Sequence, residues 1–164
     1  MAQKTFKELR DDVVKDGGLH TCLYFDLHSN SPDALKEVMV GFISKLTKEE
    51  GVRFGVGEID EPMEHQGAFS ATAKVTLLVD RFGTLVSLCS SYGPIGVEIE
   101  EPLEVRLPLH EAQEALLLVS SISQQFTNIM LKKGMDENEK AAFEGKMKAR
   151  IELGKRLLGT AGRE

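Results

Sequence analysis

Two segments of the chain, GEIDEPMEH at residues 57–65 and VEIEEPLEV at residues 97–105, repeat one pattern of acidic and apolar residues. Before each of them the chain runs through the same succession, an alternating polar and apolar segment followed by a segment with helical spacing. This recurrence predicts an internal duplication, in which each half consists of a strand, a helix and a second strand. The alternative is a chance recurrence of a Glu-rich pattern.

The first half begins with a strictly alternating segment at residues 19–28. One side of it is apolar, and the other carries His20, Cys22, Tyr24, Asp26 and His28. A period of two is typical of a strand with one buried face. Residues 31–51 then predict a helix, with Ser31 as N-cap and Pro32 at its first position. Residues 52–62 predict the second strand, with a bulge at Gly55 and Gly57.

The second half repeats this order with a strand at residues 69–80, a short helix at 81–93 and a strand at 96–107. Right-handed connections that do not cross favour a four-stranded antiparallel sheet, a ferredoxin-like βαββαβ plait of the α+β class. The two EI[D/E]EP segments then lie on opposite edges of the sheet. Pro62 and Pro102 suit such edges because proline cannot donate to a strand ladder.

We expect residues 1–164 to form a single domain. Within it, residues 17–108 make the plait, from the halves 17–65 and 68–108, and residues 109–158 add a C-terminal helical hairpin. Residues 109–133 carry two apolar stripes, which indicates burial on two sides. We therefore expect this helix to pack partly on the plait and partly on another subunit, giving a homo-oligomer, most simply a homodimer.

The last helix is expected to begin with a capping box formed by Asp136 and Glu139. Its apolar stripe is narrow and consists of Phe143, Met147, Ile151 and Leu158. Residues 132–164 hold nine Lys and Arg against six Asp and Glu, so their net charge is +3 and the remainder carries −9, which sum to −6. This basic segment is either a solvated helix face or a surface for an acidic partner, such as another copy of the chain.

The composition excludes several classes of protein. A formal charge of −6 argues against a nucleic-acid-binding protein, which needs a basic surface. We find no apolar run of membrane-spanning length and no signal peptide in the N-terminal sequence. Cys22 and Cys89 have no metal-ligand spacing. These observations predict a reduced, cytoplasmic protein without membrane or nucleic-acid partners.

A candidate metal or catalytic site lies on the polar side of the first strand. If the last strand pairs beside it, Glu98 and Glu100 share that face, and the expected register brings Glu98 close to His28 and Asp26. These types suit a Zn- or Fe-like site, with His28, Asp26, Glu98 and Glu100 as candidate ligands. His28, Asp26 and Glu98 also suit acid–base catalysis. The alternative is a face that is polar for solvation alone. The sequence requires no cofactor, and the cofactor that this face would suit is a divalent metal.

Residues 75–99 resemble the opening strand, helix and second strand of ACT-type regulatory domains. The resemblance rests on the following residues: Asp80, Arg81, Gly83, Leu85, Leu88, Gly96, Val97 and Ile99. Phe82 stands where that family usually has proline. The resemblance implies a small-effector site at Asp80, Arg81, Phe82 and Gly83, where backbone N–H groups at the helix start suit a carboxylate.

Two functions follow from these features. The first is a cytoplasmic, oligomeric binding or regulatory protein without enzymatic activity, which binds a small effector or a partner. The alternative is a small enzyme that depends on a metal or a His/carboxylate pair, with its site on the open face of the sheet.

Overall fold

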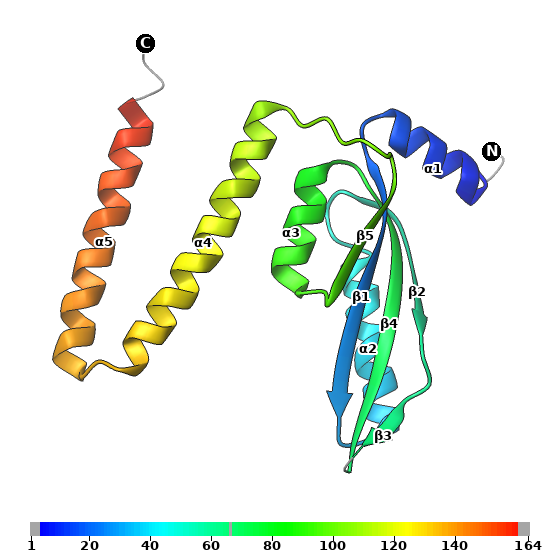
Figure 1. Cartoon of the computed structure of the whole chain (residues 1–164), viewed down its shortest axis with the longest axis horizontal. Coiled ribbons are helices and arrows are strands. Elements are labelled where there is room, and N and C mark those ends of the chain that lie inside the picture. The colour runs from blue at the N-terminus through cyan, green and yellow to red at the C-terminus, as the bar shows by residue number, and fades with distance from the viewer. Residues whose placement is uncertain (1–3, 66, 161–164) are drawn as a thin grey trace. The chain divides into compact units, whose positions relative to one another are not determined.

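A computed structural model describes residues 4–65 and 67–160 of the chain (Figure 1). The protein is a mixed α/β structure whose strands are antiparallel, in the order β2-β4-β1-β5, with β3 also paired to β4. The strands are β1 (Leu19–Ser29), β2 (Val52–Ile59), β3 (Met63–His65), β4 (Ala68–Val79) and β5 (Gly96–Glu101). The helices are α1 (Phe6–Lys15), α2 (Pro32–Leu46), α3 (Phe82–Tyr92), α4 (Leu109–Lys133) and α5 (Glu137–Thr160).

The sheet has five strands, where the sequence predicted four. The additional strand β3 arises because Met63–His65 turns back and pairs with Ser70, Phe69 and Ala68 at the start of β4. The centre of the sheet is the long pair of β1 and β4, in register from Leu19 opposite Val79 to Ser29 opposite Phe69. Strands β2 and β5, in which the two EI[D/E]EP segments begin, stand at the two ends of the strand order, as predicted.

The hydrophobic core lies between one face of the sheet and the helices α2 and α3. Ser31 caps α2 and Pro32 occupies its first turn, which confirms the predicted helix start. Two glycines of β2 allow α2 to approach closely. A Cβ added at Gly55 would lie 2.4 Å from Thr47 Cγ2, and one added at Gly57 would lie 2.7 Å from Ile43 Cδ1. The bulge expected at these glycines instead falls between Val52 and Phe54.

Helix α1 is an element that our sequence analysis did not predict. A capping box starts it: the Glu8 N–H donates to Thr5 Oγ1, and the Thr5 N–H donates to Glu8 Oε2. Its first residue, Phe6, contacts the rings of His20 and Phe54, with centroid distances of 5.6 and 5.0 Å. Helix α1 therefore covers one end of the polar face of β1. Near that end the His20 side chain is 9% exposed, whereas the His28 side chain at the other end is 67% exposed.

The chain divides into two compact units, the first ending at Leu118 and the second beginning at Val119, within α4. In the second unit, Lys132 Nζ lies 2.6 Å from Glu144 Oε1. The predicted capping box of α5 is confirmed, because the Glu139 N–H donates to Asp136 and the Asp136 N–H donates to Glu139. Of the predicted apolar stripe, the side chains of Met147, Ile151 and Leu158 lie outside the described residues.

Candidate ligand pocket

The register of β1 and β5 separates the residues of the expected metal or catalytic site. Glu98 lies opposite Cys22, and Gly96 at the start of β5 lies opposite Tyr24. Asp26 and His28 therefore continue beyond the end of β5. The expectation that Glu98 approaches His28 and Asp26 is wrong, because β5 begins too late in the sequence to reach them.

Each of these groups has a different neighbour instead. His28 Nε2 lies 3.3 Å from Asp26 Oδ2 at the exposed end of β1. Glu98 accepts a hydrogen bond of 2.8 Å from the Tyr24 hydroxyl, and this bond, with partial desolvation, raises the pKa of Tyr24 to about 12. Across residues 4–65 and 67–160, no group of three or more His, Cys, Asp and Glu side chains is placed to hold a metal ion.

Glu100 lies near the covered end of this face. Its carboxylate accepts from Cys22 Sγ at 3.3 Å, and its other oxygen is 3.1 Å from His20 Nδ1. The contact with His20 is close without being aligned as a hydrogen bond, so both imidazole nitrogens lack a hydrogen-bond partner among the described residues. Burial raises the pKa of the Cys22 thiol, which opposes thiolate formation and a nucleophilic role.

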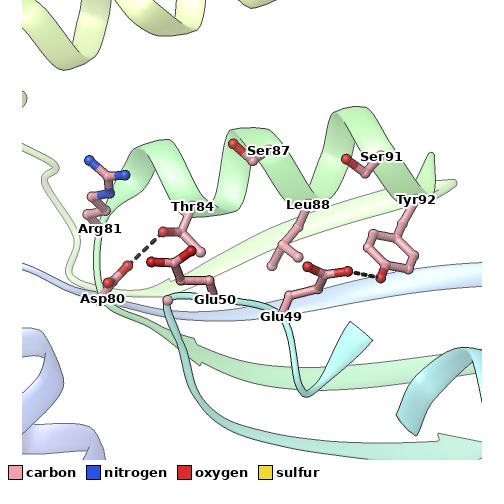
Figure 2. Close-up of a pocket in the computed structure, with 10 residues that line it drawn as sticks. Glu49, Glu50, Asp80, Arg81, Thr84, Ser87, Leu88, Ser91 and Tyr92 are labelled. Atoms are coloured by element: carbon pink, nitrogen blue, oxygen red, sulfur yellow. Dashed lines mark hydrogen bonds between the residues drawn. The ribbon is translucent and has the colours of Figure 1, made fainter. Parts of the chain in front are cut away.

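A pocket of about 380 Å³ lies on the other side of the sheet, against α3. Three parts of the first unit line it, as Figure 2 shows: the turn after α2, the end of β4 and one face of α3. The lining residues are Glu49, Glu50, Gly51, Asp80, Arg81, Thr84, Ser87, Leu88, Ser91 and Tyr92. On α3 they recur at helical spacing, so one helix face contributes four hydroxyl-bearing residues to the lining. In Figure 2 the Thr84 and Tyr92 side chains point toward the carboxylates.

Hydrogen bonds fix two of the three carboxylates in this pocket. Thr84 Oγ1 donates to Asp80 Oδ1 at 2.6 Å, and the Tyr92 hydroxyl donates to Glu49 Oε1. Burial, together with the bond to Glu49, raises the pKa of Tyr92 to about 12. In Figure 2 the carboxylates of Glu49, Glu50 and Asp80 point into the gap below α3, while the Arg81 guanidinium points away from them. The lining therefore holds three carboxylates and four hydroxyl-bearing residues, and Arg53 Nη2, 3.9 Å from Asp80 Oδ2, partly balances the charge of one carboxylate.

The expected effector turn at residues 80–83 is only partly in this pocket. Asp80 and Arg81 line it, whereas Phe82 packs against the hydrophobic core. The Gly83 N–H donates to Glu111 Oε1 at 2.6 Å. The carboxylate that we expected at this helix start therefore comes from the chain itself. Sequence reasoning missed Glu111, because an acidic residue in the first turn of a helix has no feature that indicates a distant partner.

The protein thus has a mixed α/β fold with an antiparallel sheet and C-terminal helices. The chain belongs to the MJ0538 family, whose model matches residues 20–152. No curated protein and no solved structure matches the chain. The family match corrects the resemblance to ACT-type domains: residues 75–99 lie inside a match to a different family, and no ACT-type model matches. The description of the family names no activity.

In the described part of the chain, none of the helices combines the length and the apolar character that crossing a membrane requires.

Proposed function

We propose that this protein is a cytoplasmic, non-enzymatic binding protein that assembles into a homo-oligomer through α4. The observation that carries the proposal is the apolar surface of that helix. The large apolar side chains of α4 that are exposed are Leu109, Leu116, Leu117, Val119, Ile122, Phe126, Ile129, Met130 and Leu131. Residues 115–131 also include no Asp, Glu, Lys or Arg. A helix that faces water on all sides normally carries charge, so this pattern favours a protein partner.

A second copy of the chain is the occupant that we propose for this surface. Val119, Ile122, Phe126 and Ile129 follow the alternating spacing of three and four residues that is typical of helices packed side by side. Such a stripe can pair with its own copy about a twofold axis. The charge distribution also supports self-association, because residues 132–164 carry +3 and the remainder −9, in each copy.

Light scattering after size-exclusion chromatography tests the assembly. We expect the wild-type protein to give a multiple of its 18.1 kDa chain mass. The double variant Ile122→Glu, Phe126→Glu should give a single chain mass, because it places charge within the apolar stripe. The control is Leu103→Glu, which alters a side chain that is 99% exposed outside α4 and should leave the mass unchanged. A wild-type monomer would exclude this proposal.

We also propose that the pocket against α3 binds a small polar ligand that carries an ammonium group. Its lining holds three carboxylates, and the guanidinium of Arg81 is directed away from them. Acidic lining favours a cation, and the hydroxyl groups of Thr84, Ser87 and Ser91 suit further polar contacts.

An NMR titration with 1,4-diaminobutane, and with succinate as the oppositely charged control, tests this ligand class. We expect the diamine to shift the amide signals of Gly51 and Thr84, and the variant Glu50→Gln to weaken that effect. Equal effects of the diamine and succinate, or none from either, would exclude a cation-binding pocket.

Two further interpretations belong to this proposal. We infer that the four long strands are an elaborated ferredoxin-like βαββαβ plait, since their order agrees with that topology and β3 can be regarded as an addition. A reducing compartment is supported by Cys22 and Cys89, which are both free thiols.

A further inference from the structure

The start of α3 is capped by a residue from a distant part of the chain. Its N-cap residue, Arg81, makes no capping hydrogen bond with its side chain in the described structure. The first N–H groups of a helix have no partner within the helix, so they need an acceptor from outside it. Glu111, in the first turn of α4, supplies one: its Oε1 accepts from the Gly83 N–H at 2.6 Å.

Glu111 makes this contact from a buried position. Glu111 is 7% exposed, and a buried carboxylate is costly unless hydrogen bonds compensate for the lost water. A charge-assisted bond to a helix N-terminus provides such compensation. A Cβ at residue 83 would lie 3.1 Å from Glu111 Oε1, so a larger residue there would require the carboxylate to shift.

The same contact joins the ligand pocket to α4. Gly83 follows Asp80 and Arg81, which line the pocket. A smaller cavity of about 70 Å³ lies between α3 and the first turns of α4, and Glu114, Ala115 and Leu118 line its α4 side. Arg81 and Ser87 line both cavities. The pocket and the cavity against the first turns of α4 therefore share two of their lining residues.

We infer that Glu111 is a positioning residue that holds the first turn of α4 against the start of α3, and so couples the pocket to the assembly helix. The coupling rests on the proposed function, whereas the positioning of α4 does not. Glu111→Gln removes the charge and keeps the shape of the side chain. Glu104→Gln is the matched control, because Glu104 is an exposed glutamate in the segment before α4 and lines neither cavity.

Amide hydrogen exchange tests the positioning directly. In Glu111→Gln we expect exchange at Gly83 and in the first turns of α4 to accelerate by about 10-fold, the effect of weakening one charge-assisted hydrogen bond. In Glu104→Gln the rates should match the wild type. Unchanged exchange at Gly83 in Glu111→Gln would overturn the inference, and this result is independent of whether α4 assembles or the pocket binds a ligand.

Chemical rescue distinguishes a specific carboxylate site from general loosening. In Glu111→Ala we expect added acetate to restore the protection of the Gly83 amide, while chloride at equal ionic strength does not. Equal effects of the two salts would contradict a carboxylate site. If Glu111→Ala does not fold, the exchange of Glu111→Gln still decides the question.

The coupling is tested by the assembly itself. We expect the dissociation constant of the oligomer, measured by light scattering against concentration, to change by about 10-fold in Glu111→Gln and not in Glu104→Gln, because the first turn of α4 would no longer be held at the start of α3. Accelerated exchange at Gly83 with an unchanged dissociation constant would overturn the coupling and reduce Glu111 to a local cap. A wild-type monomer would instead overturn the proposed assembly.

Discussion

The hydroxyl group of Tyr92 donates a hydrogen bond to the carboxylate of Glu49, and this bond ties the last turn of α3 to the turn that follows α2. Lys45 of α2 also lies over the Tyr92 ring, 5.8 Å from its centroid. Tyr92 therefore joins the two helices that cover the core face of the sheet, at the rim of the pocket.

Tyr92→Phe should reduce the free energy of unfolding by about 1–2 kcal/mol, because it removes the donor from a partly buried carboxylate. Urea denaturation followed by circular dichroism measures this change. Tyr24→Phe is the matched control: it removes the same group from an exposed bond to Glu98, so the loss should be smaller. An equal loss in both variants would contradict the structural role given to Tyr92.

In an alkaline titration, both tyrosines should ionise at a pH well above the ordinary tyrosine pKa of about 10. The chain has two tyrosines and no tryptophan, and the pKa of each is raised to about 12. Because the folded state favours the neutral phenol, its contribution to stability is complete below pH 10 and is lost as the pH rises towards 12. Glu98→Gln should lower the pKa of Tyr24 alone, measured by ultraviolet absorbance. Tyrosinate forming near pH 10 in the wild-type protein would contradict these hydrogen bonds.

Gly57→Ala should destabilise the protein by about 1–3 kcal/mol, since the added Cβ would lie 2.7 Å from Ile43 Cδ1. The control is Gly41→Ala within α2, where the structure places nothing within 4 Å of the new Cβ. There the substitution should stabilise by up to about 1 kcal/mol, because alanine favours a helix. Thermal unfolding compares the two. A neutral Gly57→Ala would mean that α2 lies further from β2.

Native alkylation with iodoacetamide should modify Cys89 faster than Cys22. Burial raises the pKa of both thiols, but Cys22 is 1% exposed and Cys89 is only partly buried. Peptide mass spectrometry after short reaction times gives the order. Preferential labelling of Cys22 would indicate that the face of the sheet below α1 opens readily.

The sequence predicted the elements that depend on local patterns. The period-two segment at residues 19–28 and the Ser31 cap follow from residue spacing. The end positions of β2 and β5 in the strand order follow from the rules for right-handed connections that do not cross. Helix α1 was missed, although Thr5 and Glu8 form the capping-box pattern that marks its start.

The candidate site was harder to predict, because it depends on where strands begin. We expected Glu98 to lie close to His28, but in the observed register it lies opposite Cys22. The contact between Gly83 and Glu111 joins residues that are distant in the sequence, and no local pattern indicates it. Asp80 and Arg81 were identified as candidate ligand residues on the basis of a resemblance that the family match overturns.

The edge positions of β2 and β5 have a consequence for aggregation. An exposed edge strand can template the addition of further strands, and this is a route to amyloid-like fibrils. Here Glu58 lies in one edge strand and Glu98 and Glu100 lie in the other, so a second copy that approached either edge in the same way would meet carboxylates with its own. The duplicated acidic segment thus protects both sides of the sheet against open-ended growth, and the closed assembly that we propose through α4 would use neither edge.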